Sequence, residues 1–147
     1  MAKCKDVMTR EPVAVEPGDS VTRVATLMKQ EDVGSVPVVE SGAARGLVGI
    51  VTDRDLVVKV LAGGRPVDQA KVNDAMTPDP VSCREDDDVE KAIALMKEHQ
   101  VRRIPVVDAN GALAGIIAQA DIATRIDLDR KTGELVEAIS ESNVSRR

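Results

Sequence analysis

The hydrophobic pattern of this chain alternates between helical and extended segments. Apolar residues with the spacing i, i+3, i+4 and i+7 occur twice, at Val21, Val24, Ala25 and Met28 and again at Val89, Ala92, Ile93 and Met96. This spacing places the apolar side chains on one face of a helix. A polar or acidic start precedes each stripe, Gly18-Asp19-Ser20 in one case and Asp86-Asp87-Asp88 in the other. The pattern therefore predicts two amphipathic helices with defined beginnings.

Runs of β-branched residues predict the strands. Short extended pieces at 13–15 and 81–83 precede the two helices, and four longer runs follow them at 36–39, 47–51, 104–107 and 113–117. Asn110-Gly111 separates the last two runs and predicts a tight hairpin turn in which both residues have positive φ. A second helix is expected in each half, over 53–61, where Gly63-Gly64 stops it, and over 119–126. The order of elements in each half is βαββα.

The two halves are copies of one unit. A shift of 68 positions aligns Asp6-Val7-Met8-Thr9 with Asp74-Ala75-Met76-Thr77 and Pro37-Val38-Val39 with Pro105-Val106-Val107. After a loop that is two residues longer in the first copy, a shift of 66 aligns Asp55 with Asp121. Such internal repetition predicts that the fold consists of two similar structural units. We expect a first repeat over 6–62, a linker over 63–73 and a second repeat over 74–128. A short amphipathic C-terminal helix and a frayed tail are expected over 129–147.

Composition narrows the classes of partner. The 147 residues include no Phe, Tyr or Trp, so bases cannot stack on aromatic rings and the core must be aliphatic. The net charge of −5 would repel a nucleic-acid backbone. No apolar run is long enough to span a bilayer, and the polar start lacks the apolar stretch of a signal peptide. We therefore expect a cytoplasmic protein without nucleic-acid or membrane partners. A repeat of under about 60 residues is marginal alone, so the two copies should pack together.

Several residues that could carry chemistry have simpler interpretations. Cys4 and Cys83 fit no metal-ligand spacing and are interpreted as small apolar residues. The acidic run Glu85–Asp88 complements a helix N-terminus, and His99 is interpreted as a solvated residue near a helix end. Four methionines at repeat-equivalent places are expected to fill the core: Met8, Met28, Met76 and Met96. Because the sequence contains no nucleophile and base pair, metal cluster or phosphate-gripping loop, no enzymatic activity and no metal site are expected.

The order of motifs resembles a known family. Each copy has Met-Thr, then Pro-Val, then a Pro-Val-Val strand, and the first continues as Gly-Ile-Val-Thr-Asp-Arg-Asp-Leu over 49–56. This pattern resembles the cystathionine β-synthase (CBS) domain, and two copies resemble a CBS pair, or Bateman module, of the stand-alone bacterial type. The resemblance covers about 6–128. It implies an α+β fold with two repeats packed about a pseudo-twofold axis, two clefts that commonly bind adenosine-containing ligands, and a homodimer.

The first candidate site residues are Thr52 and Asp55. A Thr-x-x-Asp at the end of a strand is a capping box, in which each residue satisfies a free N–H at the helix start. In the functional interpretation, Asp55 accepts hydrogen bonds from a ribose diol while Thr52 approaches a ribose or phosphate oxygen. Both interpretations can hold together. The second copy keeps the carboxylate at Asp121 but has Ala118 in place of the hydroxyl residue, so its cleft is expected to be weak or empty.

Basic residues supply the candidate phosphate contacts. Arg102 and Arg103 precede the strand at Ile104, where the first copy has Gly34-Ser35. They are either solvated surface residues or, as the resemblance implies, phosphate ligands whose planar guanidinium suits that role. We hypothesise one main site that combines Thr52 and Asp55 with Arg102 and Arg103 across the pseudo-twofold. Arg54, on the exposed side of its helix start, is a secondary phosphate candidate.

Two functions from different classes remain open. In the first, AMP, ADP or ATP binds as a regulatory ligand, no cofactor is required, and a homodimer transmits the signal to an unidentified protein partner. Adenine would lie between aliphatic side chains and contact backbone groups of the extended pieces at 9–13 and 33–37, or of their partners at 77–81 and 101–105. In the second, the chain is a ligand-independent dimerisation or docking module. Loss of the hydroxyl in one copy keeps this alternative open.

Overall fold

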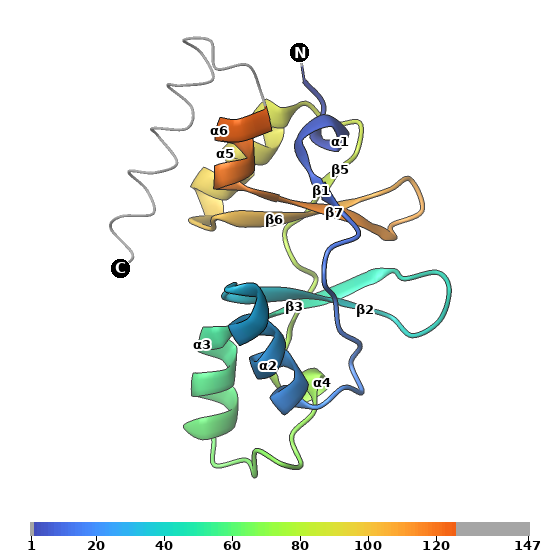
Figure 1. Ribbon diagram of the computed structural model, residues 1–147. Helices are drawn as coiled ribbons and strands as arrows, with labels where there is room; N and C mark the ends of the chain where they lie inside the picture. Colours follow the sequence, from blue (N-terminus) through green and yellow to red (C-terminus); the bar gives the residue numbers. More distant parts are fainter. Residues whose placement is uncertain (1, 126–147) are drawn as a thin grey trace. The chain divides into compact units, whose positions relative to one another are not determined.

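The computed structural model describes residues 2–125, which form two compact units (Figure 1). Unit 1 contains residues 2–12 and 81–125, and unit 2 contains Val13–Pro80. In each unit the helices lie on one side of a small sheet, as the predicted α+β class requires (Figure 1). Among residues 2–125, no helix has the length and apolar character to cross a bilayer.

Unit 2 is built on an antiparallel hairpin. Its sheet has the order β2-β3-β4, and Val15 adds a parallel bridge to Val38 beside β2. Its elements in chain order are α2 (Val21–Glu31), β2 (Ser35–Val39), β3 (Leu47–Thr52), α3 (Asp53–Asp55), the π-helix η1 (Leu56–Leu61), α4 (Val72–Ala75) and β4 (Thr77–Pro78).

Unit 1 repeats this plan with the second hairpin. Its sheet has the order β1-β7-β6-β5, with β5 parallel to β6 and the other pairs antiparallel. Its elements are α1 (Cys4–Val7), β1 (Thr9–Arg10), β5 (Cys83–Arg84), α5 (Val89–His99), β6 (Arg103–Val107), β7 (Leu113–Ala118) and α6 (Gln119–Arg125).

The two Met-Thr segments are exchanged between the repeats. Thr9 of the first repeat pairs with Ile116 in β7, and Thr77 of the second pairs with Ile50 in β3. The glycines beside these pairs permit the close approach. A Cβ on Gly115 would lie 2.6 Å from the Met8 sulfur, and one on Gly49 would lie 2.8 Å from the Met76 sulfur. Each compact unit therefore takes its main hairpin from one repeat and an edge strand from the other.

Both cores are aliphatic, as the composition requires. The amphipathic stripes face these cores, except that Ala25 is exposed. Met8, Met28 and Met96 are buried, and Met76 packs against the core of unit 2, which confirms their interpretation as core residues. Because Ala25 contributes little apolar surface, its exposure costs the helix little.

The second helix of the first repeat differs from the expectation. The segment 53–61 begins as α3 and continues as the π-helix η1, in which the N–H of Ala62 donates to the carbonyl of Val57 at 2.8 Å. The chain then turns at Gly64, whose φ is +74°. The helix expected over 119–126 is observed as α6, while the C-terminal helix and tail expected over 129–147 lie outside the described residues.

The hairpin at Asn110-Gly111 forms, but with a different turn. Only Gly111 has positive φ, at +83°. The Asp108 carboxylate accepts hydrogen bonds from the N–H groups of Asn110 and Ala112 at 2.9 and 3.0 Å. Because this side chain satisfies the donors of the loop, Asn110 does not need a left-handed conformation.

The acidic run before α5 holds the start of the chain. Asp88 lies 2.8 Å from the Lys3 ammonium group, and Asp86 lies 3.0 Å from that of Lys5. The Lys3 ammonium lowers the pKa of Asp88 through a hydrogen bond and charge attraction, and Asp88 raises the pKa of Lys3 in the same way. The acidic run therefore binds the lysines at the start of α1 through ion pairs, in addition to complementing the N-terminus of α5.

Candidate functional site

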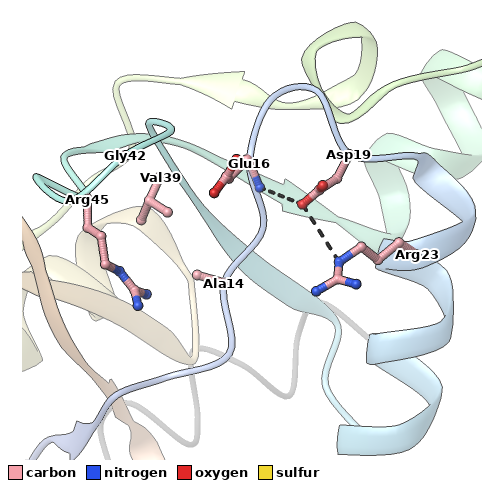
Figure 2. A pocket seen from close by; sticks show the side chains of 7 residues that line it. All are labelled: Ala14, Glu16, Asp19, Arg23, Val39, Gly42 and Arg45. Atoms are coloured by element: carbon pink, nitrogen blue, oxygen red, sulfur yellow. Dashed lines mark hydrogen bonds and ion pairs between the residues drawn. The ribbon is translucent and has the colours of Figure 1, made fainter.

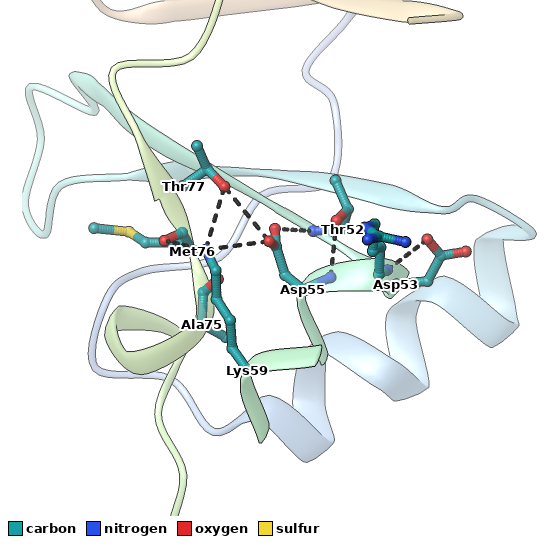
Figure 3. Close-up of polar contacts among 8 residues, drawn as sticks. Thr52, Asp53, Asp55, Lys59, Ala75, Met76 and Thr77 are labelled. Carbon is teal, nitrogen blue, oxygen red and sulfur yellow. Dashed lines mark hydrogen bonds and ion pairs between the residues drawn. The ribbon is translucent and has the colours of Figure 1, made fainter. Parts of the chain in front are cut away.

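The Thr52-x-x-Asp55 motif forms a complete capping box where β3 passes into α3. The Thr52 N–H donates to Asp55 Oδ2 at 2.9 Å, and the Asp55 N–H donates to Thr52 Oγ1 at 3.0 Å (Figure 3). This confirms the capping interpretation. It also orients the carboxylate, since the Asp55 side chain cannot turn away without losing the hydrogen bond from the Thr52 N–H.

Two further side chains converge on Asp55. Its Oδ1 atom lies 3.2 Å from the Lys59 ammonium group and 3.5 Å from Thr77 Oγ1, which donates to it (Figure 3). The Lys59 ammonium also donates to the carbonyl of Ala75 at 3.1 Å. The side chain of Asp55 is only 12% exposed, whereas that of Lys59 is 41% exposed. The cluster thus joins the end of β3 to the segment that enters from the second repeat.

Sequence reasoning missed the side chains of Lys59 and Thr77 as members of this site, although the backbone of 77–81 was a candidate for contact with adenine. The acid and lysine four residues apart, Asp55 and Lys59, were a readable signal for a pair on one helix face. Thr77 is the repeat equivalent of Thr9, and only the exchange of the Met-Thr segments brings it to Asp55. No pattern within the first repeat could have placed it there.

The equivalent place in unit 1 is simpler. The Ala118 N–H donates to Asp121 Oδ2 at 3.0 Å, which is half of a capping box because Ala118 has no hydroxyl. Arg103 pairs with Ala118 across the hairpin, and the Arg102 carbonyl accepts from the Gln119 N–H at 2.9 Å. Arg102, Arg103 and Asp121 therefore lie at the same end of the β6–β7 hairpin, with Arg102 exposed and Arg103 half-buried.

The predicted composite site combines residues of unit 2 with residues of unit 1. The hypothesis that joins Thr52 and Asp55 to Arg102 and Arg103 draws on both units and stays a prediction. Arg54 is exposed, as expected, and its N–H donates to the Asp53 carboxylate at 2.8 Å.

A separate pocket lies at the opposite end of the β2–β3 hairpin. It has a volume of about 270 Å³ and is lined by Ala14, Glu16, Asp19, Arg23, Val39, Gly42 and Arg45 (Figure 2). Asp19 accepts a hydrogen bond from the Glu16 N–H at 2.8 Å and lies 3.7 Å from Arg23 Nε. Two acidic and two basic side chains balance each other here. The pocket contains none of the residues that the sequence predicted for ligand binding.

The described part of the chain offers no obvious metal centre. Within residues 2–125, no three His, Cys, Asp or Glu side chains are grouped in a way that could hold a metal ion. The chemistry of the Asp55 cluster is instead that of a fixed hydrogen-bond acceptor beside an ammonium group, which suits a ligand with hydroxyl groups.

Comparison with known proteins identifies the family. The model of the CBS domain matches residues 4–62 and 72–128. The CBS domain-containing protein YhcV of Bacillus subtilis is 38% identical over 98% of this chain and 99% of its own. Among solved structures, Hypoxic Response Protein I with two coordinated zinc ions is 29% identical, covers 86% of this chain and all of its own, and has a TM-score of 0.76. CBSX2 in complex with AMP is 31% identical, covers 84% of this chain and 95% of its own, and has a TM-score of 0.71. This chain therefore belongs to the CBS-domain family and carries two CBS domains in tandem.

Proposed function

We propose that this CBS pair is a non-enzymatic regulatory module that binds an adenosine-containing nucleotide of the AMP, ADP or ATP type through Asp55. The observation that supports this most is the fixed carboxylate of Asp55 at the end of β3. Its two oxygens accept hydrogen bonds from the Thr52 N–H and the Thr77 hydroxyl, and the Lys59 ammonium group lies 3.2 Å from Oδ1. A carboxylate offers about four acceptor positions, so it has capacity for the two hydroxyl groups of a diol.

The fixed geometry favours binding. Because the capping box already orders the Asp55 side chain, that side chain loses little rotamer entropy when a ligand binds to it. The diol of a ribose donates two hydrogen bonds and matches a carboxylate in this respect. Lys59, Arg102 and Arg103 are then candidates for contact with phosphate oxygens. The complex of the related CBSX2 with AMP supports the same ligand class.

The same contacts suggest how a bound ligand could change the conformation of the protein. Asp55 accepts a hydrogen bond from Thr77, and Lys59 donates one to the Ala75 carbonyl, so both side chains contact a segment contributed by the second repeat. A nucleotide that competes for Oδ1 of Asp55 changes how firmly this segment is held. A ligand shifts the balance between two arrangements only through different affinity for each. We propose that a homodimer transmits this change to a protein partner.

Calorimetric titration with AMP, ADP and ATP tests the proposal. Asp55→Asn should weaken binding at least 10-fold, because an amide oxygen replaces the carboxylate that receives the diol. Asp53→Asn is the matched control, since Asp53 is an exposed neighbouring acid and should leave affinity unchanged. The thermal midpoint of each variant shows that it is folded. Equal affinity of the two variants would contradict the role of Asp55.

The phosphate contacts need a separate comparison. Arg102→Ala and Arg103→Ala should each reduce affinity for ATP more than for adenosine, while Arg84→Ala, at an exposed arginine in β5, should not. If all three variants bind ATP equally well, Arg102 and Arg103 are surface residues and only the ribose part of the proposal stands.

A second candidate function rests on exposed apolar side chains. Val57, Val58 and Leu61 on the π-helix η1 are 54%, 47% and 63% exposed. Large apolar groups gathered on one short helix are typical of a protein–protein contact surface. This favours the ligand-independent dimerisation or docking module. Light scattering tests the surface, because Leu61→Glu should dissociate a dimer that uses it. The nucleotide response distinguishes the two functions: a thermal midpoint that no nucleotide changes would favour the docking module.

A further inference from the structure

The two cysteines of the chain meet in the core of unit 1. Cys4 in α1 is 0% exposed and Cys83 in β5 is 2% exposed, and both belong to one hydrophobic cluster. The Cys4 thiol donates to the Asp88 carbonyl at 3.8 Å and the Cys83 thiol donates to the Pro105 carbonyl at 3.9 Å, and the interaction between the two thiols shifts the pKa of each. This contact is long-range in the sequence, because α1 comes from the first repeat and β5 from the second.

The backbone around the thiols holds them in place. The Cys4 N–H donates to the Asp87 carbonyl at 2.8 Å, and the Lys5 N–H donates to the Glu85 carbonyl at 3.0 Å. Cys83 pairs with Val106 in the parallel β5–β6 ladder. Two anchored elements therefore hold the two buried cysteines in the same core.

The equivalent positions in unit 2 show which side chains can fill the core where unit 1 has its two cysteines. The repeat equivalents of Cys4 and Cys83 are Val72 and Val15, which are 0% and 1% exposed in the other core. An apolar pair of similar size thus satisfies the same fold position. Packing of the core therefore does not require thiol groups at these positions, and the reactivity of the two cysteines is an additional property of unit 1.

We propose that Cys4 and Cys83 form a reversible disulfide that locks the exchanged N-terminal segment onto unit 1. With hydrogen peroxide as oxidant, the Cys4 thiolate attacks one peroxide oxygen, so that an S–O bond forms, the O–O bond breaks and the leaving hydroxide takes up a proton as water. The Cys83 sulfur then attacks the Cys4 sulfenic acid. The S–S bond forms, the S–O bond breaks, and hydroxide leaves as water with the Cys83 proton. In total, two thiols lose two electrons and two protons, and one peroxide becomes two waters.

The environment assigns the order of these steps. Interaction with the Cys83 thiol lowers the pKa of Cys4, whereas interaction with Cys4, together with burial, raises the pKa of Cys83. Cys4 is therefore the attacking group and Cys83 the resolving one. Since α1 has only four residues and lies at the start of the described chain, local opening of this helix gives the oxidant access.

The test compares the reduced and peroxide-treated protein. After alkylation of free thiols under denaturing conditions, the treated protein should contain a cross-linked peptide with Cys4 and Cys83, about 2 Da lighter than the two reduced peptides together. Dithiothreitol should restore both thiols. Because the disulfide closes a loop of about 80 residues, the oxidised form should unfold about 10 °C higher than the reduced form.

Variants that copy unit 2 complete the test. Cys4→Val and Cys83→Val should fold and lose both the cross-link and the thermal response, and the corresponding Ser variants replace them if either fails to fold. Val15→Cys with Val72→Cys in unit 2 asks whether the fold position alone permits the bond. Two freely alkylated thiols after peroxide treatment would overturn the proposal, and so would cross-links only between chains or a Cys4 sulfinic acid without a disulfide.

Discussion

The Lys59 ammonium group lies 3.2 Å from Asp55 Oδ1 and 3.1 Å from the carbonyl oxygen of Ala75. One side chain therefore neutralises the candidate ligand carboxylate and holds the end of α4 at the same time. Any ligand that draws on Asp55 must act within this arrangement, because Lys59 cannot move toward a phosphate without loosening Ala75.

Lys59→Met should loosen the α4–β4 segment while preserving the hydrophobic stem of the side chain. We expect a loss of about 1 kcal/mol in the free energy of unfolding, since the ammonium group is partly exposed and its charge is screened. Urea unfolding measures this loss, and faster hydrogen exchange over 72–78 locates it. Lys29→Met, at an exposed lysine of α2, is the control and should change neither quantity.

Gly115→Ala should weaken the contact between β1 and β7. The added Cβ would lie 2.6 Å from the Met8 sulfur and 2.8 Å from the Thr9 carbonyl oxygen. Overpacking of this kind costs about 2 kcal/mol, which chemical denaturation can measure. Gly18→Ala meets nothing within 4 Å and serves as the control. Equal stability of the two variants would show that the edge strand yields without cost.

Gln100→Gly should stabilise the protein. Gln100 caps α5 with a φ of +55°, a left-handed conformation that favours glycine. We expect a gain of about 0.5–1 kcal/mol, visible as a higher thermal midpoint. Ala94→Gly, at an exposed position inside the same helix, should instead destabilise by about 1 kcal/mol. A lower midpoint for Gln100→Gly would contradict the prediction.

The attachment of α1 should depend on pH through Lys3 and Asp88. Because Lys3 lowers the pKa of Asp88 below its usual 3.8, their ion pair contributes fully above that value and is lost as the pH falls through the lowered pKa. Because the pKa of Lys3 is raised above its usual 10.5, the ion pair also contributes fully below that value and is lost as the pH rises through the raised pKa. In an NMR titration, Lys3→Met should return the pKa of Asp88 toward 3.8, whereas Lys5→Met should affect it less. An unchanged titration of Asp88 in Lys3→Met would show that another group lowers its pKa.

Local patterns in the sequence predicted most of the elements. The helices α2 and α5 begin at the first residue of their apolar stripes, and the four long strands extend the β-branched runs by no more than one residue. The capping box at Thr52 and Asp55 was also readable, because it depends on residues three positions apart. Such features follow from contacts between near neighbours in the chain, which periodicity and side-chain chemistry describe well.

Tertiary structure decided the parts that depend on distant contacts. The strands β1 and β4 have two residues each, too few for any periodicity, and only their pairing with Ile116 and Ile50 defines them. That exchange brings Thr77 to Asp55 and Cys4 to Cys83. The sequence by itself thus determined two copies of one aliphatic βαββα unit and the carboxylate at the end of β3. Packing decided which segments complete each unit, because edge-strand pairing and buried contacts are chosen by the whole core rather than by neighbours along the chain.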